Sequence, residues 1–389
     1  MANQMFEVTQ NRNVFFGNGS IAQVENIIKT VNASKVFVLT YSKEAPALKD
    51  VLDAIAKADA STYICDIVQD EPNLAIVDQL ASLMTTNKCD AVLALGGGSI
   101  LDAAKAAAMV ATNGGTAEEY QMEGRPISKP SLPLIMVPTT AGTGSESTRT
   151  AVICNQKLDL KKSFYSNHMI AGTVILDPSV TTALPSHVTA FTGIDALSHG
   201  IESYVSLNAN VYTKMYSLKA IELAGKSLLA AVKDGANIEA RADMLYASYF
   251  AGVSLHAGIG LAHIIAQPLG GLFKIPHGEG CSIFLPYAME FNLPNCVKEY
   301  CEIGRVLGLK LDGDTGENAR LAIDKVREII AAVGTATSIG PFVKKAGVEM
   351  DAAQLDKTVD FVAQATGHIK CNPRVIDSGV IKDVISRAM

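Results

Sequence analysis

The segment DAVLALGGGSILDAAKAAAMVA, residues 90–111, joins an apolar run to a second, longer apolar stretch through three consecutive glycines. Residues 90–95 have the near-continuous apolar character of a parallel strand that is buried on both faces. Residues 100–111 follow a helical pattern and are long enough to form a helix. The segment therefore predicts a β-strand that turns through glycine into an α-helix.

Similar strand and helix patterns occur on both sides of this segment. We expect further strands at Lys35–Thr40, Tyr63–Val68, Leu134–Val137 and Val174–Leu176, and helices at Ala45–Ala58 and Ile76–Met84. Strands that alternate with helices are typical of βαβ units, which form a mostly parallel sheet. We predict an α/β domain with a mostly parallel sheet over residues 1–185.

The pattern changes after Leu184-Pro185. From Ser186 onward the sequence contains long helical patterns and almost no convincing strand. The expected helices cover residues 189–207, 213–233, 238–255, 258–269, 318–331 and 357–364. We predict an all-α C-terminal domain over residues 186–389.

Length and composition limit the classes of protein that need to be considered. The chain has 389 residues, of which 48% are hydrophobic and 19% charged. These values suit two domains with a sizeable core and exclude a disordered chain. The net charge is −6 and no block of basic residues occurs, so we expect no nucleic-acid partner.

The sequence also bears on the compartment. Residues 252–273 are mostly apolar and long enough to span a bilayer, but they include His256, His263, Gln267 and Pro268, which are costly in lipid. We therefore expect a buried helix and no membrane association. Seven scattered cysteines without a CxxC pair indicate free thiols in a reducing compartment. With no signal peptide pattern at the start, we expect a cytoplasmic enzyme.

The glycine-rich loop at residues 96–102 has the composition of a phosphate-binding turn. Glycine lets a backbone approach a ligand closely, and the N-terminus of the following helix attracts anions such as a pyrophosphate. Ser99 and Asp102 have the spacing of a capping box, which predicts the start of that helix. The GxGxxG fingerprint is absent, so a tight structural turn is the alternative interpretation.

A second loop, PTTAGTGSE at residues 138–146, follows the strand pattern LIMVP. Its hydroxyl groups and glycines suit contacts with phosphate, ribose or amide groups. Ligands of open α/β sheets bind at the carboxyl ends of the strands. Two such loops after strands of one expected sheet predict a nucleotide-binding site.

Four residues of the second half form a candidate metal site. Asp195 and His199 are four residues apart and share one helix face, although an ion pair is the simpler interpretation of these two alone. His263 and His277 also occur in apolar or glycine-rich surroundings. One carboxylate and three imidazoles suit Zn²⁺ or Fe²⁺ and suit Ca²⁺ or Mg²⁺ poorly.

Four motifs resemble those of the iron-containing, or group III, alcohol dehydrogenases. They are GGGSILDAAK (96–105), VPTTAGTGSESTR (137–149), DALSHGIESY (195–204) and GLAHIIAQPLGGLFKIPHGEG (260–280). The resemblance covers nearly the whole chain. It implies an N-terminal dinucleotide-binding domain, a helical C-terminal domain, and an active site between them that uses NAD and one divalent metal. We also expect a homodimer.

The resemblance carries over to individual positions. It implies the metal ligands Asp195, His199, His263 and His277. It implies cofactor contacts from Tyr41, Gly97, Gly98, Ser99, Asp102, Thr139, Thr140, Ser145 and Lys162, with Asp102 near the nicotinamide end. We interpret Asp102, Gln267 and His277 as catalytic candidates.

Two positions depart from the family pattern. Many NAD-preferring members have an aspartate where this chain has Tyr41, and that aspartate holds the ribose 2′-hydroxyl. The use of NADP is therefore possible alongside NAD. Most members have a histidine where this chain has Gln267, which cannot titrate. His256 is a candidate for its proton-relay role, and a core or pocket-lining position is the alternative.

We predict the reversible reduction of a small aldehyde to a primary alcohol. Residues 206–213 are similar to the corresponding stretch of 4-hydroxybutyrate dehydrogenases, and Arg149, Lys161 and Lys162 suit an anionic aldehyde such as succinate semialdehyde or sulfoacetaldehyde. Ordinary surface roles are the alternative for these three, and we favour that for Lys161. A dehydroquinate-synthase-like lyase and a non-catalytic metal- or nucleotide-binding protein are the remaining alternatives.

Overall fold

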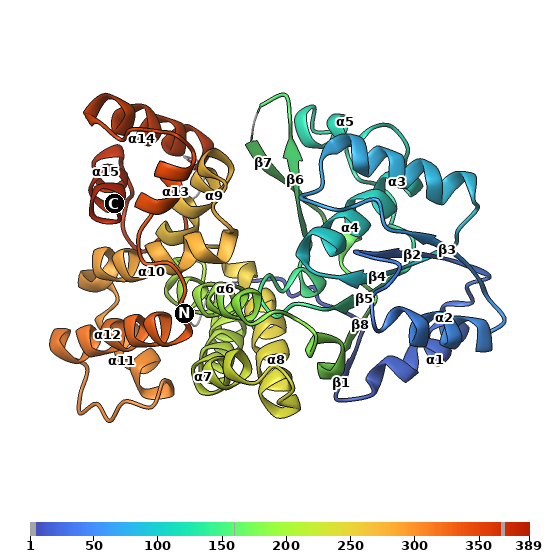
Figure 1. Cartoon of the computed structure of the whole chain (residues 1–389), viewed down its shortest axis with the longest axis horizontal. Helices are drawn as coiled ribbons and strands as arrows, with labels where there is room; N and C mark the ends of the chain where they lie inside the picture. The colour runs from blue at the N-terminus through green and yellow to red at the C-terminus, as the bar shows by residue number, and fades with distance from the viewer. Residues whose placement is uncertain (1–4, 159, 367–369) are drawn as a thin grey trace. The chain divides into compact units, whose positions relative to one another are not determined.

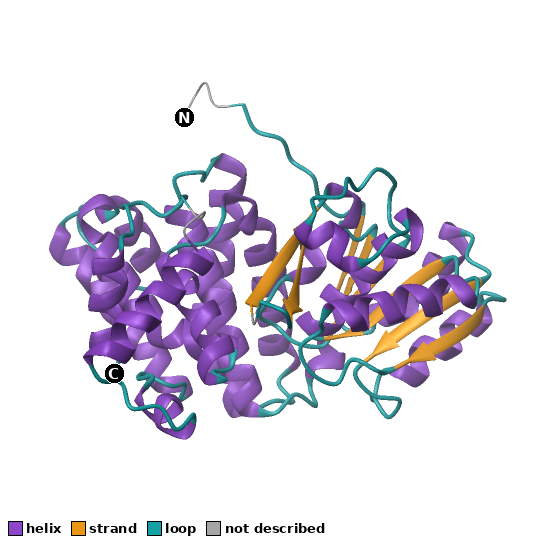
Figure 2. Cartoon of the chain, turned by 90° about the horizontal axis from the view of Figure 1, so that it is seen from above, coloured by secondary structure: helices purple, strands orange, loops and turns teal. Residues whose placement is uncertain are grey.

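The computed structural model describes residues 5–158, 160–366 and 370–389. The described chain divides into two compact units. The first consists of Met5–Leu184 together with Ala236–Leu245, and the second of Pro185–Gly235 together with Tyr246–Met389. Strands belong to the first unit, while the second is helical throughout its described residues (Figures 1 and 2).

The first unit is built on a six-stranded sheet with the order β1-β8-β5-β4-β2-β3. The strands are β1 Asn13–Phe16, β2 Lys35–Thr40, β3 Ser61–Cys65, β4 Ala91–Gly96, β5 Leu134–Pro138 and β8 Thr173–Leu176. Every neighbouring pair is parallel. The prediction of an α/β domain with a mostly parallel sheet is confirmed, although the four-residue β1 was not expected.

Helices cover both faces of this sheet. They are α1 Val24–Val31, α2 Leu48–Lys57, α3 Leu74–Thr86, α4 Gly98–Asn113 and α5 Ala117–Met122, with 3₁₀ turns η1 Ser20–Gln23, η2 Ser145–Ser147, η3 Asn167–Met169 and η4 Pro178–Thr181. Figure 1 shows α1 and α2 on one face and α3 and α4 on the other. Because both faces are covered, β4 is buried at every position, as its apolar sequence requires.

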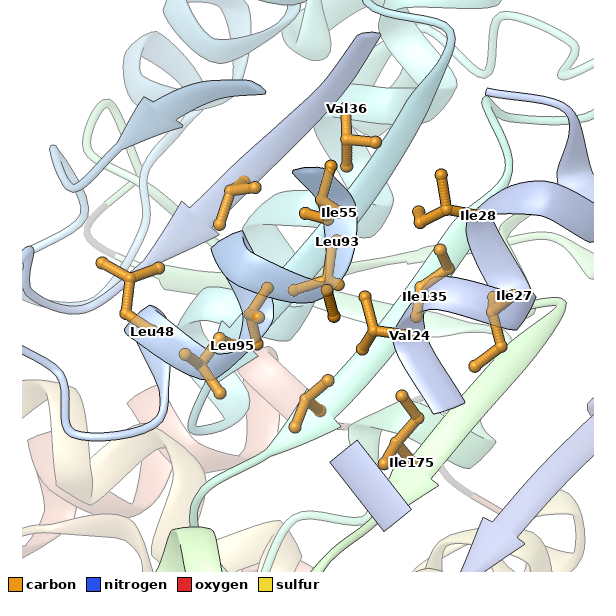
Figure 3. Packing of buried hydrophobic residues seen from close by; sticks show 14 of the residues in the cluster. Val24, Ile27, Ile28, Val36, Leu48, Ile55, Leu93, Leu95, Ile135 and Ile175 are labelled. Carbon is orange, nitrogen blue, oxygen red and sulfur yellow. The ribbon is translucent and has the colours of Figure 1, made fainter. Parts of the chain in front are cut away.

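Aliphatic side chains fill the layer between the sheet and helices α1 and α2 (Figure 3). Ile28 of α1 and Ile55 of α2 are fully buried in one cluster with Leu93 of β4 and Ile135 of β5. Burying each such side chain contributes about 1.5–3 kcal/mol to stability. This packing fixes the strands whose carboxyl ends carry the two glycine-rich loops.

A separate antiparallel hairpin follows the second loop. It pairs β6 Thr150–Asn155 with β7 Leu160–Tyr165. Sequence reasoning predicted no strand in this region. The burial of β6 alternates along its length, as expected for a strand with one covered face.

The second unit is a helical assembly. Its helices are α6 Ser186–Val205, α7 Val211–Lys233, α9 Leu261–Phe273, α10 His277–Asn292, α11 Val297–Val306, α12 Gly316–Val333, α13 Gly340–Lys345, α14 Ala352–Thr366 and α15 Ser378–Arg387, and α8 Ile238–Ser254 has residues in both units. The 3₁₀ turns η5 Leu255–Ala257 and η6 Leu293–Asn295 complete it. The predicted all-α character is confirmed.

The apolar stretch at residues 252–273 does not form one continuous helix. Gly258 has a φ of +86° and separates η5 from α9, which begins at Leu261 and not at the expected residue 258. Within the described ranges no single helix is long and apolar enough to cross a bilayer. One pair, Ile238–Ala257 and Leu261–Phe273, passes that test only jointly and is bent by 105°.

Candidate active site

The first glycine-rich loop leads directly from β4 into α4. The helix begins at Gly98, and its N-cap is Gly97, which provides no side-chain hydrogen bond. The predicted capping box between Ser99 and Asp102 is wrong, because Ser99 is exposed within the first turn and Asp102 bonds to other groups. The N–H groups at a helix start have no intrahelical acceptor, so this terminus can receive an anion.

The second glycine-rich loop lies against the first. The N–H of Thr139 donates to the carbonyl of Gly96 at 3.0 Å. A Cβ atom at Gly98 would lie 2.6 Å from the Thr143 methyl carbon, so a larger residue would push the loops apart. The glycine is therefore needed for the packing of the two loops, whether or not a ligand is bound.

Asp102 holds the second loop to α4. Its Oδ1 accepts hydrogen bonds from Ser145 Oγ at 2.5 Å and from Lys105 Nζ at 3.1 Å, and its Oδ2 accepts one from the N–H of Val152 at 2.9 Å. Burial lowers the pKa of the Lys105 ammonium group, and the Asp102 carboxylate opposes that shift. Asp102 and Ser145 thus have structural partners in addition to their expected role at the cofactor.

The three basic residues that suggested an anionic substrate have partners of their own. Arg149 donates to Asn167 Oδ1 at 3.3 Å, and Lys161 pairs with the carboxylate of Glu71. The ammonium of the third, Lys162, lies 3.7 Å from a methionine sulfur. These contacts are with groups of the protein itself, so they give no support for an anionic substrate over a neutral one.

Tyr41 directly follows β2, the neighbour of β4, and the residue is 39% exposed. We expect Tyr41→Asp to raise the ratio of kcat/KM with NADH to kcat/KM with NADPH by at least about fivefold, since like-charge repulsion in water at 4 Å is about 1 kcal/mol. Steady-state kinetics with both cofactors measures this ratio. Tyr41→Asn, which removes the ring without adding charge, is the control. An unchanged ratio in Tyr41→Asp would show that position 41 does not discriminate.

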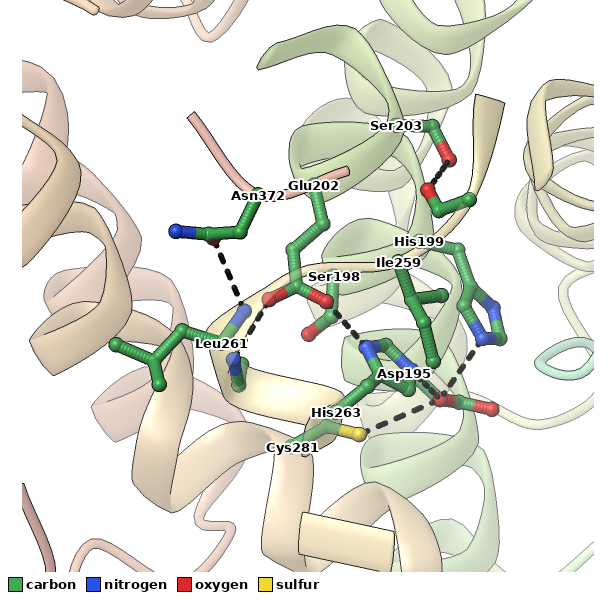
Figure 4. Close-up of polar contacts among 12 residues, drawn as sticks. Asp195, Ser198, His199, Glu202, Ser203, Ile259, Leu261, His263, Cys281 and Asn372 are labelled. Carbon is green, nitrogen blue, oxygen red and sulfur yellow. Dashed lines mark hydrogen bonds and ion pairs between the residues drawn. The ribbon is translucent and has the colours of Figure 1, made fainter. Parts of the chain in front are cut away.

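The four residues predicted as metal ligands come together in the second unit. Asp195 and His199 lie on α6, His263 lies on α9, and His277 is the first residue of α10. The Nε2 atoms of the three histidines lie 3.6, 3.4 and 3.4 Å from the same oxygen, Asp195 Oδ1 (Figure 4 shows two of them). Only His277, with a side chain 33% exposed, is open to solvent.

The spacing of this cluster suits a shared metal ion. The N···O distances exceed normal hydrogen bonds. Two donors at 2.0–2.2 Å from a tetrahedral ion are about 3.4 Å apart. Nε2 of His263 is buried and forms no hydrogen bond within the described chain, which is unfavourable unless a ligand fills its lone pair. Burial alone would raise the pKa of Asp195, but the histidines outweigh it and hold that pKa well below its usual range.

Two glycines of the HGEG sequence let α10 approach the other helices that carry the cluster. A Cβ atom at Gly278 would lie 2.0 Å from the backbone oxygen of Phe191 on α6. A Cβ atom at Gly280 would lie 3.0 Å from Cβ of Ala266 on α9. The motif therefore brings the start of α10, and with it His277, next to Asp195.

Glu202 fixes the orientation of one histidine and was missed by sequence reasoning. Its Oε2 lies 2.5 Å from Nδ1 of His263, and its Oε1 accepts a hydrogen bond from the N–H of Ala262 at 2.7 Å (Figure 4). Burial raises the pKa of Glu202, but His263 and the backbone donors outweigh it and the net shift is downward. As a carboxylate, Glu202 accepts a hydrogen bond from the Nδ1–H group of His263. The Nε2 atom of that ring then carries the lone pair, which is directed toward Asp195.

Cys281 also borders the cluster and was predicted only as a free thiol. Its sulfur lies 3.6 Å from Asp195 Oδ1 and 3.8 Å from Nε2 of His277, and its side chain is fully buried. Burial raises the pKa of the thiol to about 12. Helical spacing could have identified both residues: Glu202 follows Asp195 by seven positions, and Cys281 follows His277 by four.

Gln267 follows His263 by one turn of α9 and is partly exposed. We expect Gln267→Ala to raise KM about five- to tenfold with little change in kcat, the effect of losing one hydrogen bond to substrate of about 1 kcal/mol. Gln267→His should add a group that titrates near pH 6–7 to the kcat/KM profile. Steady-state kinetics across pH measures both. Loss of turnover at constant KM in Gln267→Ala would contradict this positioning role.

Comparison with known proteins agrees with this geometry. The family model "Iron-containing alcohol dehydrogenase" matches residues 11–178, and "Fe-containing alcohol dehydrogenase family, C-terminal" matches residues 189–389. The chain is 42% identical over 271 residues to the probable alcohol dehydrogenase EutG of Escherichia coli, which covers 69% of this chain and 67% of that one.

Two further relatives match over almost their full length. The NAD-dependent methanol dehydrogenase of Bacillus methanolicus is 31% identical over 380 residues, which is 96% of this chain and 97% of that one. A crystal structure of 1,3-propanediol oxidoreductase superposes with a TM-score of 0.92 at 28% identity and covers 99% of this chain and 100% of that one. The chain therefore belongs to the iron-containing alcohol dehydrogenase family and is an oxidoreductase.

Proposed function

We propose that the protein catalyses the reversible NAD(H)-linked reduction of a small aldehyde to a primary alcohol, with one divalent ion, Fe²⁺ or Zn²⁺, bound by Asp195, His199, His263 and His277. The observation that carries this proposal is the arrangement of three imidazole nitrogens around one buried carboxylate oxygen at the spacing of metal ligands. The names of two relatives, which refer to methanol and 1,3-propanediol, favour a short primary alcohol.

In this reaction the bound groups and the side chains around them have distinct roles. A bound divalent ion supplies Lewis acidity toward a carbonyl oxygen. A bound nicotinamide supplies or accepts the hydride. Glu202 holds the His263 ring, and Gln267 offers an amide that can hydrogen-bond substrate or water but cannot exchange a proton near pH 7. Residues 1–185 hold the nucleotide and residues 186–389 hold the metal. The proposed nucleotide contacts are Tyr41, Gly97, Gly98, Ser99, Asp102, Thr139, Thr140, Ser145 and Lys162.

A panel of aldehydes tests the proposal. Metal-free protein reconstituted with Fe²⁺ or with Zn²⁺ is assayed with NADH and with NADPH, and oxidation of the cofactor is followed by its absorbance. We expect net oxidation with short neutral aldehydes such as propanal. Faster turnover of succinate semialdehyde or sulfoacetaldehyde would indicate an anionic substrate instead. The absence of net cofactor oxidation with every aldehyde would contradict the proposal.

We also propose a cytoplasmic homodimer. The seven cysteines are all free, which suits a reducing compartment. Leu207, Val211 and Met215, before and along the first turns of α7, expose 63%, 73% and 59% of their surface, and exposed apolar side chains of this size favour a subunit contact. Sedimentation equilibrium measures the mass. A monomer at micromolar concentration would contradict the dimer.

A further inference from the structure

We propose that Cys281 supplies a sulfur donor to the divalent ion, so that the site offers one carboxylate, three imidazoles and one thiolate. This inference rests on the metal centre of the proposed function. Cys281 lies on α10, four residues after His277, and therefore on the same face of that helix. Its side chain is fully buried beside the cluster.

The distances are those expected between donors to one ion. A sulfur at about 2.3 Å and an oxygen or nitrogen at 2.0–2.2 Å from a five-coordinate metal, at donor–metal–donor angles of about 90–120°, are about 3.1–3.8 Å apart. Cys281 Sγ lies 3.6 Å from Asp195 Oδ1 and 3.8 Å from Nε2 of His277. In Figure 4 the contacts of Cys281, His263 and His199 converge on the same oxygen of Asp195.

A second observation points to a ligand at this position. Nε2 of His263 forms no hydrogen bond within the described residues, although its side chain is only 3% exposed. It is directed at the Asp195 oxygen that Cys281 also approaches. A cation bonded to Asp195 and His263 would therefore lie beside the sulfur. Binding would convert the thiol to a thiolate and release its proton to solvent.

A sulfur donor would change which ions the site prefers. Thiolate is a soft ligand that favours Zn²⁺, Co²⁺ and Cd²⁺ over harder ions such as Mn²⁺. The affinity ratio of Cd²⁺ to Mn²⁺ should therefore fall about tenfold or more in Cys281→Ser. Mutations of groups that support a metal site typically lower its metal affinity about 10- to 100-fold. Competition with a chelator measures both affinities without recourse to activity.

Cobalt substitution tests the sulfur–metal bond directly. Metal-free full-length protein is loaded with Co²⁺, and its spectrum is compared with those of Cys281→Ser and Cys281→Ala. We expect a thiolate-to-cobalt charge-transfer band in the near ultraviolet in the native protein and its loss in both variants, while the visible cobalt bands remain. Cys301→Ala, which alters a buried thiol on α11 that donates to Thr315, is the matched control and should keep the band.

The outcomes separate the two claims. Visible cobalt bands without a charge-transfer band in the native protein would overturn the sulfur donor and leave the metal centre intact, with Cys281 as a hydrogen-bond donor to Asp195. A band that persists in Cys281→Ala would overturn it equally. Failure of the native protein to bind cobalt would contradict both the sulfur donor and the proposed metal centre.

Discussion

Asp195→Asn is expected to abolish tight metal binding and aldehyde reduction while leaving the protein folded. Asparagine has the shape of aspartate, but its neutral amide is a poor ligand and supplies no negative charge among three histidines. The affinity for Zn²⁺ should fall by more than about 100-fold, the upper end of the range for groups outside the ligand sphere. Chelator competition measures the affinity, and circular dichroism reports the fold.

The matched control for this variant is Glu299→Gln. Glu299 is a partly buried acid of the same unit that pairs with Lys214 at 3.3 Å. It should keep native metal affinity and turnover. If Asp195→Asn binds Zn²⁺ as tightly as the native protein, Asp195 is not a ligand and the site has been assigned incorrectly.

Glu202→Gln is expected to lower the metal affinity about 10- to 100-fold, as is typical for the partner of a metal-binding histidine. The native carboxylate accepts two hydrogen bonds, from His263 Nδ1 and from the N–H of Ala262. A glutamine amide has only one oxygen acceptor, and its other group is an NH₂ donor. In Glu202→Gln the NH₂ group must therefore face either the His263 ring or the N–H of Ala262, both of which are donors in the native protein. If the NH₂ group faces His263, the proton moves to Nε2 and blocks the ligand lone pair.

Chelator competition at fixed pH measures the effect of Glu202→Gln. Glu302→Gln serves as its control, because Glu302 also accepts a hydrogen bond that is partly buried, from Tyr204, but does not contact the histidines through it. Restoration of affinity by Glu202→Asp, even in part, would support positioning through hydrogen bonding. Native affinity in Glu202→Gln would show that the contact with His263 has no role in metal binding.

The sequence predicted the parallel sheet well because its strands carry a strong local signal. Residues 91–96 are apolar throughout, and a strand with two covered faces requires that pattern. The four-residue β1 and the hairpin β6–β7 were missed, since short or half-covered strands have weak patterns. The expected helices at residues 238–255 and 258–269 anticipated a break here, but the second was expected to start at residue 258 and begins at Leu261, because a single glycine in an apolar run does not reveal its positive φ.

The candidate metal site could be predicted in part, because two of its ligands also give a local signal in the sequence. Asp195 and His199 reveal their proximity through helical spacing, while the approach of His263 and His277 depends on tertiary packing at Gly278 and Gly280 and is not local. The expected capping box is absent because α4 begins at Gly98 with Gly97 as its N-cap, so Ser99 lies inside the first turn, and Asp102 accepts a hydrogen bond from Ser145 instead. Local motifs indicate which chemical groups are present, and tertiary packing determines which groups they contact.

One divalent ion, held by Asp195 and the three histidines, is expected to be required for aldehyde reduction. The most direct test of this requirement is a titration of metal-free protein with Zn²⁺ or Fe²⁺, in which bound metal and the rate of NADH oxidation are measured on the same samples. We expect the rate to rise in proportion to bound metal and to reach its plateau at one ion per chain. Full activity in protein from which the metal has been removed would contradict this requirement.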